Sequence, residues 1–132
     1  MTLLLLDTTF LIDAERSDAQ LDQAIGDDDD VAIAAITVAE LQVGARLATG
    51  RRRTQRQRLV DDVCDVIPIL SYDRSVAAEH AELLVAVRQA GRPRGAHDLI
   101  TAATARASKR TVVTCDLTAF DDLPGVTVLH HR

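Results

Sequence analysis

The stretch LLLLDTTFLID, residues 3–13, decides which fold this sequence predicts. Its run of leucines at residues 3–6 indicates a strand buried on both faces, and Asp7 follows the last leucine directly. A charged side chain in that place loses hydration unless a neighbouring group compensates the loss. The stretch therefore predicts a buried strand whose end carries an acid with a specific role.

Further short apolar runs indicate strands, and longer patterns with a three- to four-residue period indicate helices between them. The predicted strands are residues 3–7, 31–35, 66–70 and 111–115, with a weaker candidate at 126–129. The predicted helices are residues 37–48, 52–64, 73–90 and 97–108. This alternation predicts an α/β fold in which helices cover both faces of a parallel sheet. The apolar stripe over 76–87 is expected to pack against that sheet, with a dimer contact as the alternative.

Length and composition predict one cytoplasmic domain that spans residues 1–132. Hydrophobic residues make up 47% of the chain, a share that excludes a disordered protein. Asp7 and Asp13 end the opening apolar run too early for a signal sequence or a membrane span. Cys64 and Cys115 lack the spacing of a zinc site or a disulfide framework, which favours two reduced thiols.

The distribution of charge is more informative than the net charge of −5. That sum argues against binding of nucleic acid through bulk attraction alone. Arginines are nevertheless concentrated in residues 46–58 and 88–110, whereas acids dominate elsewhere. Such segregation can place a cationic surface beside an anionic one, although solvated helix faces explain the same pattern. Charge by itself favours neither explanation.

Four acids stand where ligands bind in parallel α/β sheets, outside the carboxyl ends of the strands. Asp7 and Asp116 end two predicted strands. Glu40 opens the helix after the second strand, and Asp98 opens the helix before the fourth. Each acid also has a structural explanation. A capping box Thr37-x-x-Glu40 explains Glu40, and a favourable charge at a helix N-terminus explains Asp98. Turns after strands explain Asp7 and Asp116. One shared site explains all four acids more economically.

The motifs DTTFLID, TVAELQVG, HDLITAATA and VVTCD, in this order, resemble the successive motifs of PIN-domain nucleases. Their spacing most resembles the VapC toxins of type II toxin–antitoxin systems, over residues 3 to about 129. The resemblance implies a three-layer α/β/α PIN-like domain with a mainly parallel central sheet of four to five strands. The family's acidic quartet matches Asp7, Glu40, Asp98 and Asp116, and its hydroxyl-bearing positions match Thr9 and Thr114.

One position departs from the family pattern. Many relatives carry a further acid immediately before the late phenylalanine, but Ala119 precedes Phe120 in this sequence. Asp121 and Asp122 follow that phenylalanine instead. Whether either of them joins the site is left open by the sequence.

An all-oxygen cluster without nearby cysteine favours a hard cation, Mg²⁺ or Mn²⁺. We expect Asp7, Asp98 and Asp116 to hold one or two ions, with Glu40 binding metal or orienting water. The expected activity is that of a metal-dependent endoribonuclease, in which water attacks the phosphate in line and leaves a 5′-phosphate. His97 is expected to pack or to contact RNA rather than bind metal, because adjacent helix residues point in different directions.

RNA that approaches an acidic centre needs cations to hold its backbone. The candidate residues are Arg46, Arg51, Arg52, Arg53, Arg92 and Arg94. Because aromatic residues are scarce, base stacking contributes little, and recognition of folded RNA through its phosphates is favoured. The resemblance implies tRNA or a structured rRNA loop as substrate, a homodimer, and a VapB-like antitoxin whose tail crosses the acidic pocket.

Two other classes of protein compete with this interpretation. The first class is a Mg²⁺-dependent phosphoryl-transfer domain. A receiver-like domain of this class needs a cation after its last strand, whereas Lys109 precedes the strand in this chain. A haloacid-dehalogenase-type phosphatase needs Asp-x-Asp after the first strand, where this chain has Asp7-Thr8-Thr9. A catalytically silent PIN-like module that binds RNA or protein is the nonenzymatic alternative. It has no need to keep four mutually repelling acids.

Overall fold

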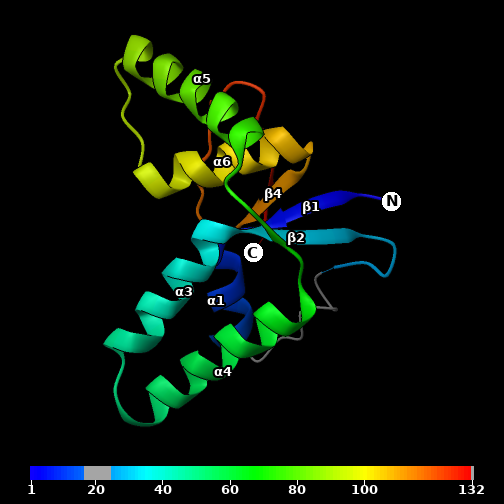
Figure 1. Cartoon of the computed structure of the whole chain (residues 1–132), viewed down its shortest axis with the longest axis vertical. Helices are drawn as coiled ribbons and strands as arrows, with labels where there is room; N and C mark the ends of the chain where they lie inside the picture. The colour runs from blue at the N-terminus through cyan, green and yellow to red at the C-terminus, as the bar shows by residue number, and fades with distance from the viewer. Residues whose placement is uncertain (17–24, 132) are drawn as a thin grey trace.

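Five parallel strands form the centre of the computed structural model, which describes residues 1–16 and 25–131 (Figure 1). They are β1 (Leu3–Leu6), β2 (Asp30–Ala34), β3 (Ile69–Leu70), β4 (Thr111–Thr114) and β5 (Val128–His130). Their order across the sheet is β3-β2-β1-β4-β5, and every neighbouring pair is parallel. The carboxyl ends of all five strands therefore lie at the same edge of the sheet.

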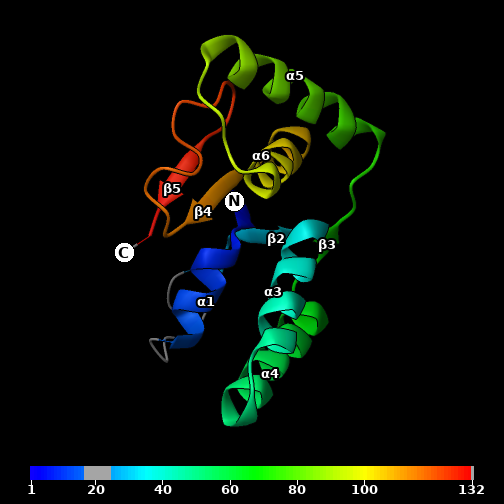
Figure 2. The same cartoon turned by 90° about the vertical axis from the view of Figure 1, so that its left-hand side faces the viewer.

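Helices cover both faces of this sheet. They are α1 (Thr8–Arg16), α3 (Ala35–Leu47), α4 (Gly50–Val66), α5 (Arg74–Ala90) and α6 (Ala96–Ser108). Helices α5 and α6 lie on one face, and α1, α3 and α4 lie on the other (Figure 2). The expected three-layer α/β/α domain with a parallel central sheet is confirmed.

The leucines of β1 divide between two cores, as the alternation of side chains along a strand requires. Leu5 packs with the apolar side chains of α5 and α6. Leu4 and Leu6 pack on the opposite face with those of α1, α3 and α4. On the first face, the small side chains of Ala102 and Ala103 are fully buried, so α6 approaches the sheet closely. The central strand is thus buried on both faces, and its end carries Asp7 into the site.

Three expectations about the elements were wrong in detail. Residues 66–68 are not strand, because α4 continues to Val66 and Pro68 has no N–H to donate to a ladder. Helix α1 was not among the predicted helices, since Thr8, Thr9 and Ile12 are β-branched and favour extended chain. The apolar stripe of α5 packs chiefly against α6 rather than against the sheet.

The capping box Thr37-x-x-Glu40, which was the alternative explanation of Glu40, is absent. Helix α3 begins at Ala35, directly after β2, and its N-cap Ala34 makes no side-chain hydrogen bond. Thr37 therefore lies inside the first turn, where it is buried and its hydroxyl has no partner among the described residues. This leaves the carboxylate of Glu40 available for another contact.

No helix in the described part of the chain is long and apolar enough to cross a membrane.

Candidate active site

Four carboxylates come together from four segments of the chain. Asp7 follows β1 directly, and Asp116 lies two residues beyond the end of β4. Asp98 is in the first turn of α6. Glu40 lies in the second turn of α3, not at its opening as the sequence suggested. All four acids belong to the edge of the sheet at which its strands end.

The pKa of Asp98 shows that these acids share one electrostatic environment. Burial is the largest cause of its rise from 3.8 to about 6, and the charges of Asp7, Glu40 and Asp116 follow in that order. The neighbouring His97 lowers the same pKa. Because like charges shift a pKa appreciably only at short range, the structure brings the predicted quartet into one site.

Two threonine hydroxyls orient the carboxylate of Asp7, which is only 5% exposed. Thr9 and Thr114 each donate from Oγ1 to Oδ2 of Asp7, both at 2.7 Å. Each hydroxyl also accepts a backbone N–H, that of Cys115 at Thr9 and that of Asp116 at Thr114. These bonds join the start of α1 to the end of β4, so both predicted threonines lie in the site as positioning groups.

Asp116 is held by the turn that follows it. Its Oδ1 accepts hydrogen bonds from the backbone N–H groups of Thr118 and Ala119, at 2.9 and 3.1 Å, and from the hydroxyl of Thr118 at 3.2 Å. The backbone hydrogen bond from Thr118 is the largest cause that keeps the pKa of Asp116 below its usual value. Asp116 is therefore ionised under conditions in which Asp98 still carries a proton.

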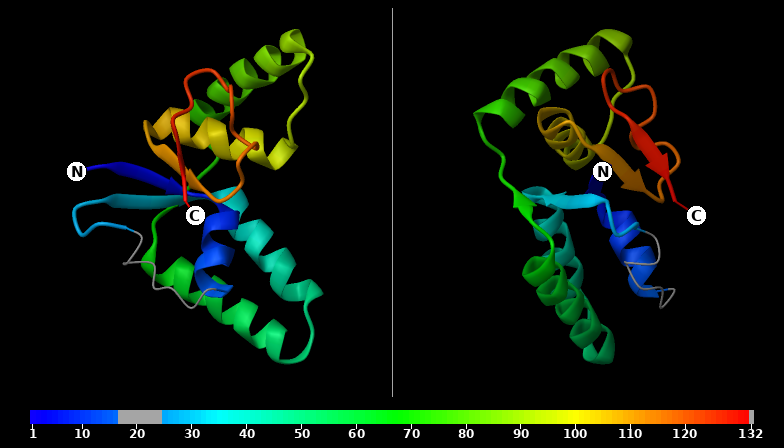
Figure 3. Two further views of the ribbon diagram at one scale, coloured as in Figure 1. Left: turned by 180° about the vertical axis from the view of Figure 1, so that it is seen from behind. Right: turned by 90° about the vertical axis from the view of Figure 1, so that its right-hand side faces the viewer.

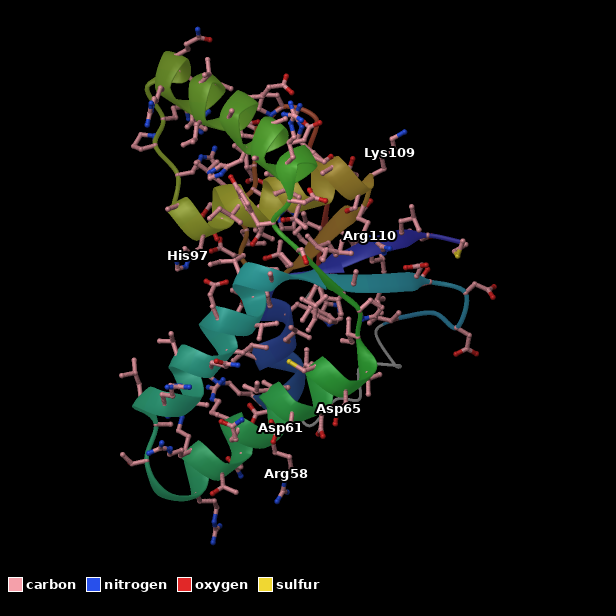
Figure 4. All side chains as sticks on the ribbon, viewed as in Figure 1. Arg58, Asp61, Asp65, His97, Lys109 and Arg110 are labelled. Atoms are coloured by element: carbon pink, nitrogen blue, oxygen red, sulfur yellow. The ribbon has the colours of Figure 1, made fainter. Side chains whose placement is uncertain are left out.

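Glu40 connects the three helices around the site. Its Oε1 accepts a hydrogen bond of 2.8 Å from the hydroxyl of Thr8 in α1, and its Oε2 lies 3.5 Å from Nδ1 of His97 in α6. His97 remains more than half exposed and stands where α6 begins, beside the start of α3 (Figure 4). Neither contact of Glu40 was predicted from the sequence, although Thr8 adjoins Asp7 and His97 adjoins Asp98.

The predicted RNA-binding arginines occupy two regions. Arg46 lies in the last turn of α3, and Arg51, Arg52 and Arg53 are exposed in the first turn of α4. Arg92 forms an exposed ion pair with Asp122. Arg94 instead donates hydrogen bonds to the backbone carbonyls of Thr118 and Asp121, at 2.8 and 2.6 Å. These bonds stabilise the turn after Asp116. The guanidinium of Arg94 is thus already engaged within the domain.

Asp121 and Asp122 contact basic side chains rather than the quartet. Asp121 lies 3.6 Å from Nε2 of His130, and Asp122 pairs with Arg92. Neither acid contributes to the pKa shift of Asp98. Lys109 caps the C-terminal end of α6, far from His97 at the other end of that helix, so it stands away from the acids (Figure 4).

The donor set of the site fits a hard divalent cation, because its carboxylates and hydroxyls are all oxygen ligands. In residues 1–16 and 25–131, however, no three acidic, histidine or cysteine side chains converge closely enough to hold an ion as they stand. Binding of a cation would therefore require side-chain rotations that bring these oxygens together.

Comparison with known proteins places this arrangement in a family. The family model described as "PIN domain" matches residues 4–126. Toxin FitB of Neisseria gonorrhoeae is 34% identical over 128 residues, which cover 89% of this chain and 91% of FitB.

Solved structures give the same result. A structure of VapBC-5, a member of the VapBC family of toxin–antitoxin systems from Mycobacterium tuberculosis, matches with a TM-score of 0.81 and 31% identity, over 99% of this chain and all of that one. VapBC2 from Rickettsia felis, bound to a promoter DNA fragment, shares the fold with a TM-score of 0.87 at 22% identity, over 99% and 100% of the two chains. The chain described here belongs to the PIN domain family.

Proposed function

We propose that this protein is a Mg²⁺- or Mn²⁺-dependent endoribonuclease that acts in the cytoplasm as the toxin of a toxin–antitoxin pair. The observation that carries the proposal is the gathering of Asp7, Glu40, Asp98 and Asp116 where the strands end, with the charges of the other three acting on Asp98. Such a cluster is unfavourable unless it serves to bind positive charge. The similarity to Toxin FitB supports the toxin assignment.

Asp7, Asp98 and Asp116 are the residues that would hold the ion, and Glu40 would join them or orient the attacking water. When bound, the cation supplies positive charge that offsets the charge developing on the scissile phosphate and makes water easier to deprotonate. Thr9 and Thr114 keep the carboxylate of Asp7 in one orientation. Asp98 has to release its proton before it can act as a ligand, which favours activity above about pH 6.

The expected reaction is hydrolysis by in-line attack of water on a backbone phosphate, without use of the RNA 2′-hydroxyl as nucleophile. It leaves a 5′-phosphate and a 3′-hydroxyl. The arginines of α3 and α4 suit a folded RNA such as tRNA, because exposed guanidinium groups bind phosphates without reading bases. Arg46, Arg51, Arg52, Arg53 and Arg92 remain candidates for these contacts.

The antitoxin surface that we propose runs along α3 from the site. Val43 and Leu47 lie three and seven residues after Glu40 and thus on the same side of the helix, and they are 55% and 79% exposed. An antitoxin segment with apolar side chains would cover them, and a basic side chain at its end would pair with the acids. We also propose that the toxin forms a homodimer.

The test is cleavage of a folded RNA by the purified protein, with identification of the new ends. Cleavage should require Mg²⁺ or Mn²⁺, should stop with EDTA, and should be lost in Asp98→Asn. The matched control is Asp65→Asn, an exposed acid on the outer side of α4 (Figure 4), which should cleave normally. Cleavage that survives EDTA, or an undiminished rate in Asp98→Asn, would refute the proposal, whereas RNA binding without any cleavage would indicate the silent module.

A further inference from the structure

A cationic groove lies between α1 and α4, away from the acids. Its lining in the described residues is Glu15, Arg16, Arg51, Arg52, Gln55 and Arg56. Both helices belong to the same layer beneath the sheet (Figure 3). Helix α1 starts beside Asp7 and ends at Arg16, so its nine residues place the groove about 12 Å from the acidic site along the helix.

Arg56 is the residue that makes this groove unusual. The buried side of α4 consists of Arg56, Val60 and Val63, a spacing at which an apolar side chain is expected. Arg56 is only 8% exposed. Within residues 1–16 and 25–131, no hydrogen bond or ion pair reaches its guanidinium, not even from Glu15 in the same groove.

Among the described residues, the guanidinium nitrogens of Arg56 do not belong to the fully buried polar atoms that lack a partner, so they still meet solvent where the side chain lines the groove. The methylenes of Arg56 can pack beside Val60, as arginine stems often do, but this packing does not satisfy the donors. A methionine would fill much of the same space but would present no hydrogen-bond donor to the groove. Because the described residues offer no acceptor to these donors, an acceptor has to come from solvent or from a ligand in the groove.

We propose that this groove binds a backbone phosphate of the RNA substrate, a proposal that rests on the ribonuclease function. A planar guanidinium donates two parallel hydrogen bonds to a phosphate, and Arg16, Arg51 and Arg52 raise the positive potential around it. RNA whose scissile phosphate lies at the acids reaches the groove by following α1. The groove holds the backbone while the acidic site, which repels phosphate, acts on it.

The test compares Arg56→Met with Arg58→Met. Both variants remove one positive charge from α4, but Arg58 is exposed on the outer side of the helix (Figure 4) and does not line the groove. Binding of a folded RNA in EDTA, where cleavage is blocked, should weaken about tenfold in Arg56→Met and less than twofold in Arg58→Met. The slope of affinity against salt concentration should fall by about one for Arg56→Met only. The thermal stability of Arg56→Met should stay close to that of the wild type.

A second variant and a second ligand complete the test. Arg56→Lys keeps the charge but not the paired donors, so its RNA affinity should lie between those of the wild type and Arg56→Met. Thermal unfolding in inorganic phosphate shows whether the groove binds free phosphate rather than RNA. If phosphate stabilises the wild type but not Arg56→Met, and the two proteins bind RNA equally well, the RNA assignment is overturned.

Equal RNA affinities in Arg56→Met and Arg58→Met would overturn the proposal, and so would an Arg56→Met variant that loses stability and nothing else. Binding of an acidic antitoxin peptide that depends on Arg56, with RNA affinity unaffected, would assign the groove to that partner and would also overturn it. Weaker RNA binding by Arg56→Met in a protein that never cleaves RNA would support the groove and refute the nuclease function, so the two failures are distinguishable.

Discussion

The hydroxyl of Thr114 donates a hydrogen bond of 2.7 Å to Oδ2 of Asp7, although the two residues are 107 positions apart in the sequence. The bond joins the ends of β1 and β4, the two strands that deliver acids to the site. It also connects two acids indirectly, because Thr114 accepts the backbone N–H of Asp116. The position of one carboxylate is therefore coupled to that of the other.

Replacement of Thr114 by valine should lower the free energy of unfolding by about 1–3 kcal/mol, because a buried carboxylate loses a donor. RNA cleavage should fall as well, since Asp7 is no longer held in one orientation. Urea denaturation measures the first effect. Thr104→Val is the control, because that buried hydroxyl only bonds the carbonyl of Ile100 in its own helix. Equal losses in the two variants would contradict the role given to Thr114.

Asp98→Asn should stabilise the protein at neutral pH. The pKa of Asp98 is raised in the folded state, from 3.8 to about 6, so the native protein prefers the protonated acid. The contribution of the protonated Asp98 to the free energy of unfolding is complete below pH 3.8 and is lost as the pH rises through about 6. Because this carboxyl is partly exposed, the gain in Asp98→Asn should be about 1 kcal/mol. The gain in the free energy of unfolding should be small near pH 4 and complete above pH 6. A gain that does not depend on pH would show that the raised pKa of Asp98 is not its cause.

Divalent cations should stabilise the wild type more than Asp98→Asn. A ligand that binds only the folded state raises the free energy of unfolding in proportion to the logarithm of its concentration. Thermal unfolding at pH 7.5 in increasing Mn²⁺ measures the effect, with Asp65→Asn as the control. An equal rise in melting temperature for wild type and Asp98→Asn would place the ion elsewhere.

Arg94→Ala should reduce cleavage about tenfold or more while it leaves RNA affinity within twofold. The three carbonyls that Arg94 binds belong to the turn that orients Asp116, so the loss of Arg94 should loosen a carboxylate of the proposed catalytic site rather than an RNA contact. Arg92→Ala removes an exposed ion pair and a candidate RNA contact nearby, but it should leave the turn intact. Hydrogen exchange at the N–H groups of Thr118 and Ala119 reports the loosening. Weaker RNA binding by Arg94→Ala, with the turn still protected, would make Arg94 an RNA contact after all.

Leu47→Asp should weaken binding of the cognate antitoxin tenfold or more and leave RNA cleavage by the free toxin unchanged. The side chain is 79% exposed, so its replacement should hardly alter stability. Its place on the same side of α3 as Glu40 makes it part of the proposed antitoxin surface. Leu129→Asp is the control, because Leu129 is also exposed but lies in the edge strand β5. An undiminished affinity of Leu47→Asp for the antitoxin would remove α3 from that surface.

The outline of the fold and the acids of the site could be predicted because they depend on local features. Apolar runs give strands, and an acid directly after a strand lies at the sheet edge whatever the rest of the chain does. The capping box that the sequence offered as an alternative role for Thr37 and Glu40 did not form, for the opposite reason. Whether Thr37 precedes α3 or lies within it depends on β2 running directly into the helix, which the spacing Thr37-x-x-Glu40 does not reveal.

An α/β domain with four acids near the edge where parallel strands end follows from the sequence alone, because side-chain periodicity and the position of a residue relative to a strand are encoded locally. Which side chains meet at that edge is set by tertiary packing: Thr8 and His97 contact Glu40, and Arg94 binds the turn after Asp116. Tertiary packing also determines that Arg56, one arginine among many in the sequence, is buried beside a groove. Such contacts depend on how helices distant in the chain pack on the two faces of the sheet, and no local pattern records that packing.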